Sequence, residues 1–160
     1  MSQTNLSSAK LIEKTNVSET LAVFKFLAKD QLSFKAGQYA SLAVEADGDL
    51  FERPYSICSS PHEGFLEFFI ELVRGGLLTP KLWELKLGST ILVRRRIVGH
   101  FTLDGNVNRH LMLATVTGVA PFVSMARTER VDRGHETVSR NEFLIIHGAS
   151  RSSDFGPYLA

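Results

Sequence analysis

The feature that most constrains the fold is a change in the residue pattern at about Asn106. Upstream of it, short apolar and β-branched runs alternate with turns that contain Gly or Pro, a pattern typical of an antiparallel barrel or sandwich. Downstream, the apolar run at 110–116 leads through a tight turn into a helical stretch at 122–131, and a second apolar run follows at 142–147. Strand, turn, helix and strand in this order predict a parallel βαβ unit.

The expected fold is therefore an antiparallel Greek-key β-barrel over residues 1–105, followed by a partial parallel Rossmann-like α/β domain over residues 106–160. Runs rich in apolar and aromatic residues predict barrel strands at 20–28, 38–44, 65–73 and 90–93. One helix is expected at 79–88, with Thr79 as its N-cap, Pro80 in its first turn and Gly88 at its end. Three apolar side chains of this helix should face inward: Leu82, Trp83 and Leu85.

Composition excludes several classes of protein. The net charge of +1 gives no strong field toward nucleic acid or an anionic membrane. The single cysteine, Cys58, excludes an intramolecular disulfide and a self-held iron–sulfur cluster; we expect it to pack as a small buried side chain. The histidines show no metal-ligand spacing, so no metal site is expected. Neither a signal peptide nor a membrane span is visible, so we expect a cytoplasmic location.

The segment Arg53-Pro54-Tyr55-Ser56 is the first candidate binding motif. We expect it at the start of a strand, where Arg53 and Tyr55 would share one face and Ser56 the other. A guanidinium can clamp phosphate and a tyrosine ring can stack on a flat heterocycle. The alternative is an edge strand with a surface arginine and a core tyrosine.

Two further segments suggest phosphate binding. The Gly-Gly-Leu-Leu-Thr-Pro run at 75–80 opens the predicted helix, where free amides attract phosphate; the alternative is a plain turn with a threonine cap. The Thr-Val-Thr-Gly-Val-Ala-Pro run at 115–121 joins a buried strand to a helix, which is where parallel α/β sheets hold nucleotides. It contains one glycine and so does not match the usual dinucleotide fingerprint.

Taken together and in this order, the motifs resemble the ferredoxin–NADP reductase family, in its bacterial-type branch. The family's R-x-Y-S motif is matched by Arg53, Tyr55 and Ser56. Its small-residue turn followed by a hydroxyl residue is matched at 76–79, its G-x-F-x-L-D stretch at 99–104 and its G-T-G-x-A-P turn at 116–121. The resemblance extends from about Lys10 to Leu159 and implies an FAD-binding barrel followed by an NADP-binding domain.

The resemblance also implies site residues. Arg53, with Pro54, would bind the FAD pyrophosphate, Tyr55 would pack on the isoalloxazine, and Ser56 would lie near flavin N5, so that Tyr55 and Ser56 are the catalytic candidates. The remaining cofactor-binding candidates are Phe69 on the adenine side, Leu77, Leu78 and Thr79 at the phosphates, Thr117 at the domain junction, and Ser150 and Arg151, which lie where the family often has an arginine.

Two departures from the family matter. The first glycine of the G-T-G turn is Val116 here, and its Cβ is expected to narrow the nucleotide site. Residues 106–160 provide two strands where the family's NADP domain has about five. One face and at least one edge of this sheet should therefore be open, so we expect lower stability after Asn106 and self-association through the open edge.

The resemblance implies a flavin-dependent oxidoreductase that moves hydride and electrons between NADP(H), FAD and an acidic carrier, ferredoxin or flavodoxin. One alternative is an FAD-binding module or fragment without pyridine-nucleotide turnover on its own. Another is a general flavin or quinone reductase. The arginines at 94–96 could help to dock an acidic carrier, but a solvated strand end or loop is the favoured interpretation.

Overall fold

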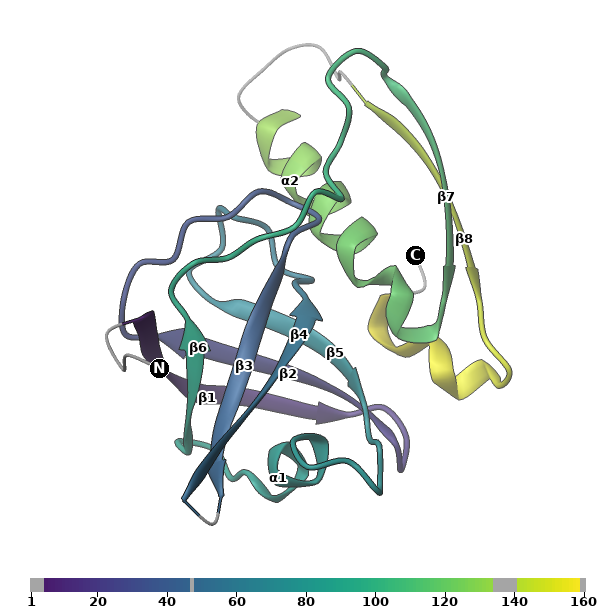
Figure 1. The fold of residues 1–160 in the computed structure, drawn as a ribbon. Helices are drawn as coiled ribbons and strands as arrows, with labels where there is room; N and C mark the ends of the chain where they lie inside the picture. The colour runs from purple at the N-terminus through teal and green to yellow at the C-terminus, as the bar shows by residue number, and fades with distance from the viewer. Residues whose placement is uncertain (1–4, 47, 134–140, 159–160) are drawn as a thin grey trace.

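The structure is a computed structural model that describes residues 5–46, 48–133 and 141–158. Six strands form one antiparallel sheet in the order β4-β3-β6-β1-β2-β5 (Figure 1). Their bounds are β1 Leu6–Asn16, β2 Leu21–Ala28, β3 Tyr39–Ala46, β4 Asp49–Ser56, β5 Leu66–Glu71 and β6 Thr90–Arg94. The two edge strands, β4 and β5, contact each other, so the sheet curls round a common core and confirms the predicted barrel-like first part.

The core of this sheet is aromatic. Phe24, Phe26 and Phe68 are completely buried inside it. The helix α1, Thr79–Glu84, covers one end of the sheet (Figure 1). Its Leu82 side chain is buried there, and Trp83 and Leu85 pack partly against the same core. The prediction that these three side chains face inward is therefore confirmed.

The bounds and cap predicted for α1 are wrong in two respects. Leu78 occupies the N-cap position, because the Thr79 hydroxyl donates to the Val73 carbonyl and accepts from the Val73 amide instead of capping the helix. The helix ends at Glu84, before Gly88. Gly88 and Ser89 exchange backbone hydrogen bonds with Leu11 in β1, and this pairing draws the chain out of the helix toward β6.

Two parts of the sheet were not predicted. β1 is rich in polar residues, and its place between β2 and β6 is fixed by pairing with both rather than by its own pattern. The strand β4 begins at Asp49, because the hairpin with β3 already pairs Ala46 with Asp49. Arg53 to Ser56 therefore form the end of a strand, and the prediction that they start one is wrong.

The second part is a parallel strand–helix–strand unit, as predicted. The strands β7 (Arg109–Thr115) and β8 (Glu142–Gly148) pair in parallel, with Met112 opposite Ile145. They are joined by the short 3₁₀ turn η2 (Val116–Val119) and by α2 (Ala120–Arg133), and a second 3₁₀ segment, η3 (Ser152–Tyr158), follows β8. The pairing changes from antiparallel to parallel between β6 and β7; the division into domains at 105 and 106 stays a prediction.

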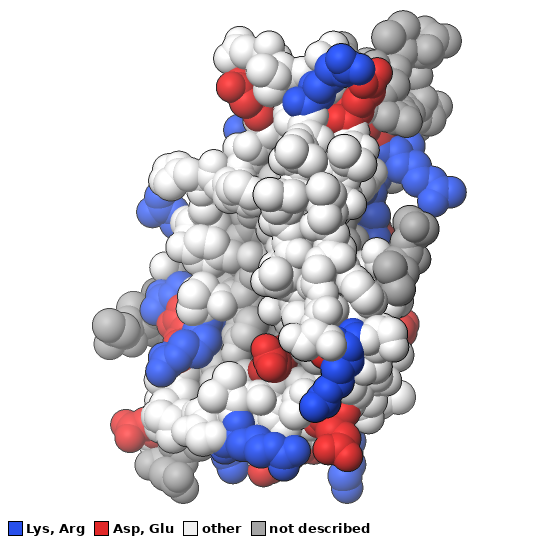
Figure 2. All heavy atoms as spheres, turned by 90° about the vertical axis from the view of Figure 1, so that its right-hand side faces the viewer, with Lys and Arg blue, Asp and Glu red and all other residues white. Residues whose placement is uncertain are grey.

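Only one face of this two-stranded sheet is covered. Met112 is buried against α2, together with Phe122 and Met125. The opposite face, which we call the outer sheet face, consists of four aliphatic side chains that are 52–66% exposed: Leu111, Leu113, Leu144 and Ile146. Figure 2 shows this side of the molecule, where a broad uncharged surface is bordered by charged side chains. The prediction that one face of this sheet is open is confirmed.

Candidate functional site

The end of β4 presents the first candidate group. Alternation along the strand sends Glu52 and Arg53 to opposite faces. Glu52 binds Arg94 through two contacts, Nε–Oε1 at 2.5 Å and Nη2–Oε2 at 2.8 Å. The exposed Arg53 guanidinium donates to the Glu52 carbonyl at 2.7 Å and forms no ion pair with any carboxylate in the described ranges. It is therefore available to an anionic ligand.

Tyr55 lies on the same face as Arg53 and is half-buried against the barrel core. Burial raises the pKa of its hydroxyl, and the nearby positive charge of Arg53 only partly opposes this effect. One side of the ring is thus fixed by packing, as a stacking platform requires. The hydroxyl of the following Ser56 makes no hydrogen bond within the described part of the chain, so it too is available.

The loop from Val73 to Thr79 is closed by side-chain and backbone bonds. Besides the two Thr79 hydroxyl contacts, the Gly76 amide donates to the Val73 carbonyl at 2.8 Å. Leu77 is 58% exposed, whereas Leu78 and Thr79 are buried. The amides of these three residues donate to no carbonyl in the described ranges, while the Thr79 hydroxyl is already occupied by Val73.

The second group lies where β7 and β8 end. Thr117 is half-buried in η2, and Ser150 and Arg151 are exposed just after β8. Because parallel strands bring their carboxyl ends to one edge of the sheet, these residues lie at the edge that binds ligands in open α/β folds. The structure thus places Thr117 near the end of β8, and η2 also packs on β5 of the barrel.

Val116, the first residue of η2, has a left-handed backbone with φ of +43°. Within the described ranges it is the only non-glycine residue with positive φ, a conformation that costs an L-residue about 1–2 kcal/mol. Glycine adopts it without that cost. The valine side chain packs against a buried cluster shared by the barrel and α2, which includes Cys58, Phe69 and Val119.

Phe69 is enclosed by the C-terminal segment. It is 4% exposed, and its ring contacts that of Tyr158 edge-on with centroids 5.3 Å apart. A Cβ on Gly156 would lie 3.2 Å from the Phe69 ring, so the segment passes close to it. The predicted role of Phe69 beside the adenine stays a prediction.

Sequence reasoning missed a buried polar cluster beside Phe69. The Glu67 side chain is 3% exposed, and its Oε1 lies 3.0 Å from Arg127 Nη1 and 2.9 Å from the Tyr158 hydroxyl. Cys58 is completely buried next to this cluster, as expected of a small packed side chain. Burial raises its pKa to about 12. The only signal in the sequence was Glu67 within the aromatic run of β5, and a charged residue at such a position is usually expected to face solvent.

The arginines at 94–96 are largely engaged within the molecule. Arg94 binds Glu52, as described above, and Arg95 Nη2 lies 2.9 Å from Asp30 Oδ2. Arg96 is exposed. The favoured interpretation of this run as a strand end thus fits the structure better than a basic docking patch.

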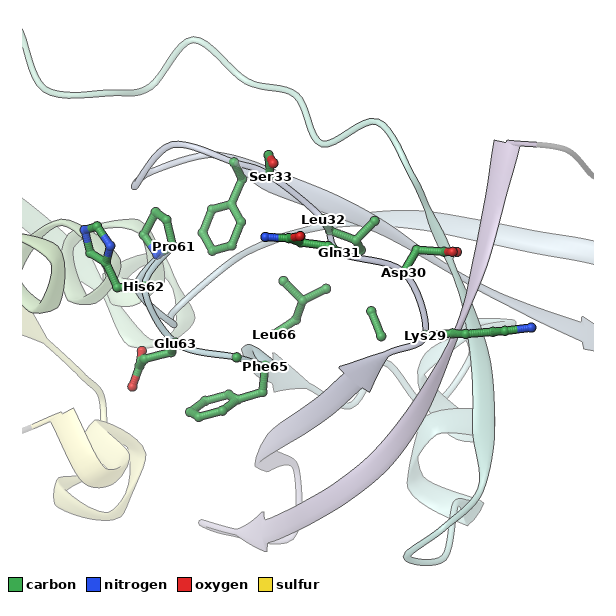
Figure 3. Close-up of a pocket in the computed structure, with 13 residues that line it drawn as sticks. Lys29, Asp30, Gln31, Leu32, Ser33, Pro61, His62, Glu63, Phe65 and Leu66 are labelled. Atoms are coloured by element: carbon green, nitrogen blue, oxygen red, sulfur yellow. The ribbon is translucent and has the colours of Figure 1, made fainter.

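A surface hollow of about 570 Å³ lies elsewhere on the barrel, between the loops at 28–34 and 61–66. Figure 3 shows its two walls, with Pro61 and His62 on the side near α2; His62 Nε2 lies 3.1 Å from Asp132 of that helix. None of the motif residues lines it. No group of three potential metal ligands occurs among the described residues, and no helix in that part of the chain is long and apolar enough to cross a membrane.

Comparison with known proteins identifies relatives along most of the chain. The family model of the oxidoreductase FAD-binding domain matches residues 8–102. A ferredoxin–NADP reductase of Azotobacter vinelandii is 35% identical over 152 residues, which are 94% of this chain and 57% of the relative. The corresponding protein of Pseudomonas aeruginosa is 34% identical over 146 residues, 90% of this chain and 55% of the relative.

Solved structures share the fold. A ferredoxin NADP+ reductase from Neisseria gonorrhoeae, with bound FAD and NADP, superposes with a TM-score of 0.82 at 24% identity, covering 95% of this chain and 61% of that one. A flavohemoglobin from Malassezia yamatoensis superposes with a TM-score of 0.79 at 22% identity, covering 96% and 40%. The chain thus spans little more than half the length of the curated relatives that it matches.

Proposed function

This chain belongs to the oxidoreductase FAD-binding domain family, and we propose that it binds FAD noncovalently as the redox centre of a ferredoxin–NADP reductase-type enzyme. The observation that carries the proposal is the pairing of Arg53 and Tyr55 on one face of β4. The guanidinium has no carboxylate partner in the described ranges, and the ring is held by the barrel core. A free cation beside a fixed aromatic ring suits a ligand with both phosphate and a flat heterocycle.

The residues present fit FAD. Arg53 would bind the pyrophosphate together with the amides of Leu77, Leu78 and Thr79, and Pro54 would hold the strand edge between Arg53 and Tyr55. Tyr55 would pack on the isoalloxazine, and the unengaged Ser56 hydroxyl would donate to the ring at its reacting edge. FAD, when bound, supplies hydride acceptance and single-electron release. Phe69, whose ring contacts Tyr158, would lie on the adenine side of the cofactor.

The nucleotide that delivers hydride would be NADPH, held at the carboxyl edge of β7 and β8. Thr117 would lie at the junction with the flavin, and Ser150 and Arg151 would face the nucleotide phosphates. The electrons would pass to ferredoxin or flavodoxin, the acceptors that the names of the relatives print. With Arg94 and Arg95 engaged, Arg96 is the cation of the 94–96 run that remains for an acidic carrier.

One experiment tests the proposal in two steps. The purified protein is titrated with FAD and followed by its visible spectrum and fluorescence, and the complex is then mixed with NADPH under anaerobic conditions. We expect a bound-flavin spectrum and then bleaching of the visible flavin absorption. A protein that gains no flavin spectrum refutes the binding proposal. Steady-state rates measured with ferredoxin and with free flavin as the electron acceptor then distinguish a ferredoxin reductase from a general flavin reductase.

A second candidate function is an FAD-binding module without pyridine-nucleotide turnover of its own. Two observations favour it: the parallel sheet in the described ranges has only two strands, and Val116 occupies a position whose backbone suits glycine. In this case FAD binds, but NADPH bleaches it slowly. The rate of bleaching in the experiment above therefore decides between the two candidates.

Self-association would follow from the same sheet. Both β7 and β8 have an edge without a strand partner in the described part of the chain, and the outer sheet face is apolar. Unpaired, apolar edges attract further strands, so we propose that the chain associates with itself through β7 and β8. We also propose a cytoplasmic location, where reduced nicotinamides and electron carriers occur.

A further inference from the structure

A histidine near the end of β8 binds the strained residue that directly follows β7. The side chain of His147 reaches across the sheet edge, and its Nε2 lies 2.9 Å from the carbonyl oxygen of Val116. A carbonyl can only accept, so Nε2 carries the proton of this bond. The other ring nitrogen, Nδ1, is buried and has no hydrogen-bond partner in the described ranges. The bond to Val116 is thus the one polar contact that this ring makes there.

The ring is held in place from two sides. The parallel register sets His147 opposite Ala114, two residues before Val116. The ring of Phe155 in η3 contacts the imidazole edge-on, with centroids 5.1 Å apart and an angle of 85° between planes. The imidazole therefore acts as a fixed donor at the edge where the proposed nucleotide site lies.

The backbone conformation of Val116 is unfavourable for a valine, so a hydrogen bond that holds it matters more here than at a residue with an ordinary φ. A β-branched residue with φ of +43° is an outlier that persists only when the surroundings determine it. Its side chain is held by the cluster around Cys58 and Phe69, and its carbonyl is held by His147. Loss of the second contact frees the peptide between Val116 and Thr117 to rotate, which would reorient the Thr117 amide and hydroxyl.

We propose that His147 is a positioning residue that locks Val116 in the left-handed conformation and so orients Thr117 and the η2 turn toward the pyridine nucleotide. The proposal rests on the proposed function for its kinetic consequence, but the lock itself is a property of the turn. It predicts that His147 matters because residue 116 is a valine. With glycine at 116, the turn should keep its shape without the histidine.

The test is a double-mutant cycle between His147→Ala and Val116→Gly, with FAD bound. We expect His147→Ala to slow anaerobic reduction by NADPH roughly ten- to hundredfold, while the FAD dissociation constant stays within about twofold. The double variant should recover to within about threefold of Val116→Gly alone. His147→Gln, which keeps a donor, should recover part of the rate, and Phe155→Leu controls for the lost ring contact.

Hydrogen exchange gives a readout that does not depend on turnover. The Ala120 amide donates to the Thr117 carbonyl, so its protection reports the shape of η2. It should fall in His147→Ala and return in the double variant. Strictly additive effects of His147→Ala and Val116→Gly on the protection of this amide would refute the proposed role of His147. If NADPH fails to reduce the parent protein while the protection cycle shows coupling, the proposed function fails and the lock stands.

Discussion

Arg127 of α2 and Glu67 of β5 form an ion pair whose carboxylate is 3% exposed while its guanidinium is 35% exposed. The same Glu67 oxygen accepts from the Tyr158 hydroxyl, and Lys25 lies 3.8 Å from the other oxygen. One buried carboxylate of the barrel thus holds both α2 and η3. The proposed nucleotide turn lies in η2, directly before α2. The Arg127–Glu67 ion pair therefore fixes the position of this turn relative to the barrel.

Removal of the guanidinium should loosen α2 from the barrel. Arg127→Ala leaves Glu67 with Tyr158 and Lys25, so we expect a loss of about 1–3 kcal/mol in the free energy of unfolding rather than the full cost of an unpaired buried charge. Urea unfolding measures it. Arg130→Ala, at an exposed position of the same helix, is the control and should change stability by less than about 0.5 kcal/mol. Equal losses in the two variants would contradict the prediction.

Stability should fall at alkaline pH because of Cys58. Burial raises its pKa from 9.0 to about 12, so between these values the unfolded chain has lost a proton that the folded chain retains. The free energy of unfolding should therefore decrease by about 1.4 kcal/mol per pH unit as the pH rises from 9. Above pH 10, Tyr158, whose pKa burial also raises, adds to the slope. Denaturant titrations at pH 8 to 10 measure it, and in Cys58→Ala the decrease in this range should be smaller by the contribution of the thiol.

Loss of the Arg53 side chain should weaken FAD binding. Arg53→Ala removes charge-assisted hydrogen bonds to the pyrophosphate, so we expect a loss of about 1.5–3 kcal/mol in binding free energy. Fluorescence titration with FAD measures the dissociation constant. Arg96→Ala removes the same charge from another exposed position of the barrel part and should leave that constant unchanged. If both variants bind equally well, Arg53 does not contact the pyrophosphate.

The ring of Tyr55 should quench the flavin. Tyr55→Ala is expected to retain most of the FAD affinity, since phosphate contacts remain, and to raise the fluorescence of the bound flavin because the stacked ring is gone. Tyr55→Phe keeps the ring and should stay quenched. Unchanged fluorescence in Tyr55→Ala with FAD bound would mean that Tyr55 is a core residue only.

Charges on the outer sheet face should prevent association. Leu113→Glu and Leu144→Glu, at positions 66% and 62% exposed, should give a monomer by light scattering at concentrations where the parent chain associates, because paired charges repel and must be desolvated. Ile12→Glu, at a 42% exposed position on β1, controls for added charge alone. A parent chain that is monomeric at all concentrations would refute self-association.

The sequence was most informative where pattern and local chemistry agree. The parallel unit followed from two apolar runs around a turn, and the α1 face followed from Leu82, Trp83 and Leu85. β1 could not be found in this way, because its polar residues form a central strand only through partners on both sides. The position of Val116 was recognised as unusual from the resemblance, but its left-handed backbone and its bond to His147 depend on how β7 and β8 end together. The buried position of Glu67 could not be predicted for a similar reason, since its partners come from α2 and η3.

The Glu67–Tyr158 contact also constrains how the chain is made. The two residues are 91 positions apart, which at ribosomal speeds corresponds to roughly 5–20 s of synthesis. In the first part of that interval, before Arg127 has been made, Lys25 is the one of these partners that Glu67 has, and the carboxylate must remain hydrated. The seam between β5 and the later segments is therefore completed only after Tyr158 has been made, and a nascent chain stalled before Tyr158 leaves Phe69 without the ring that covers it.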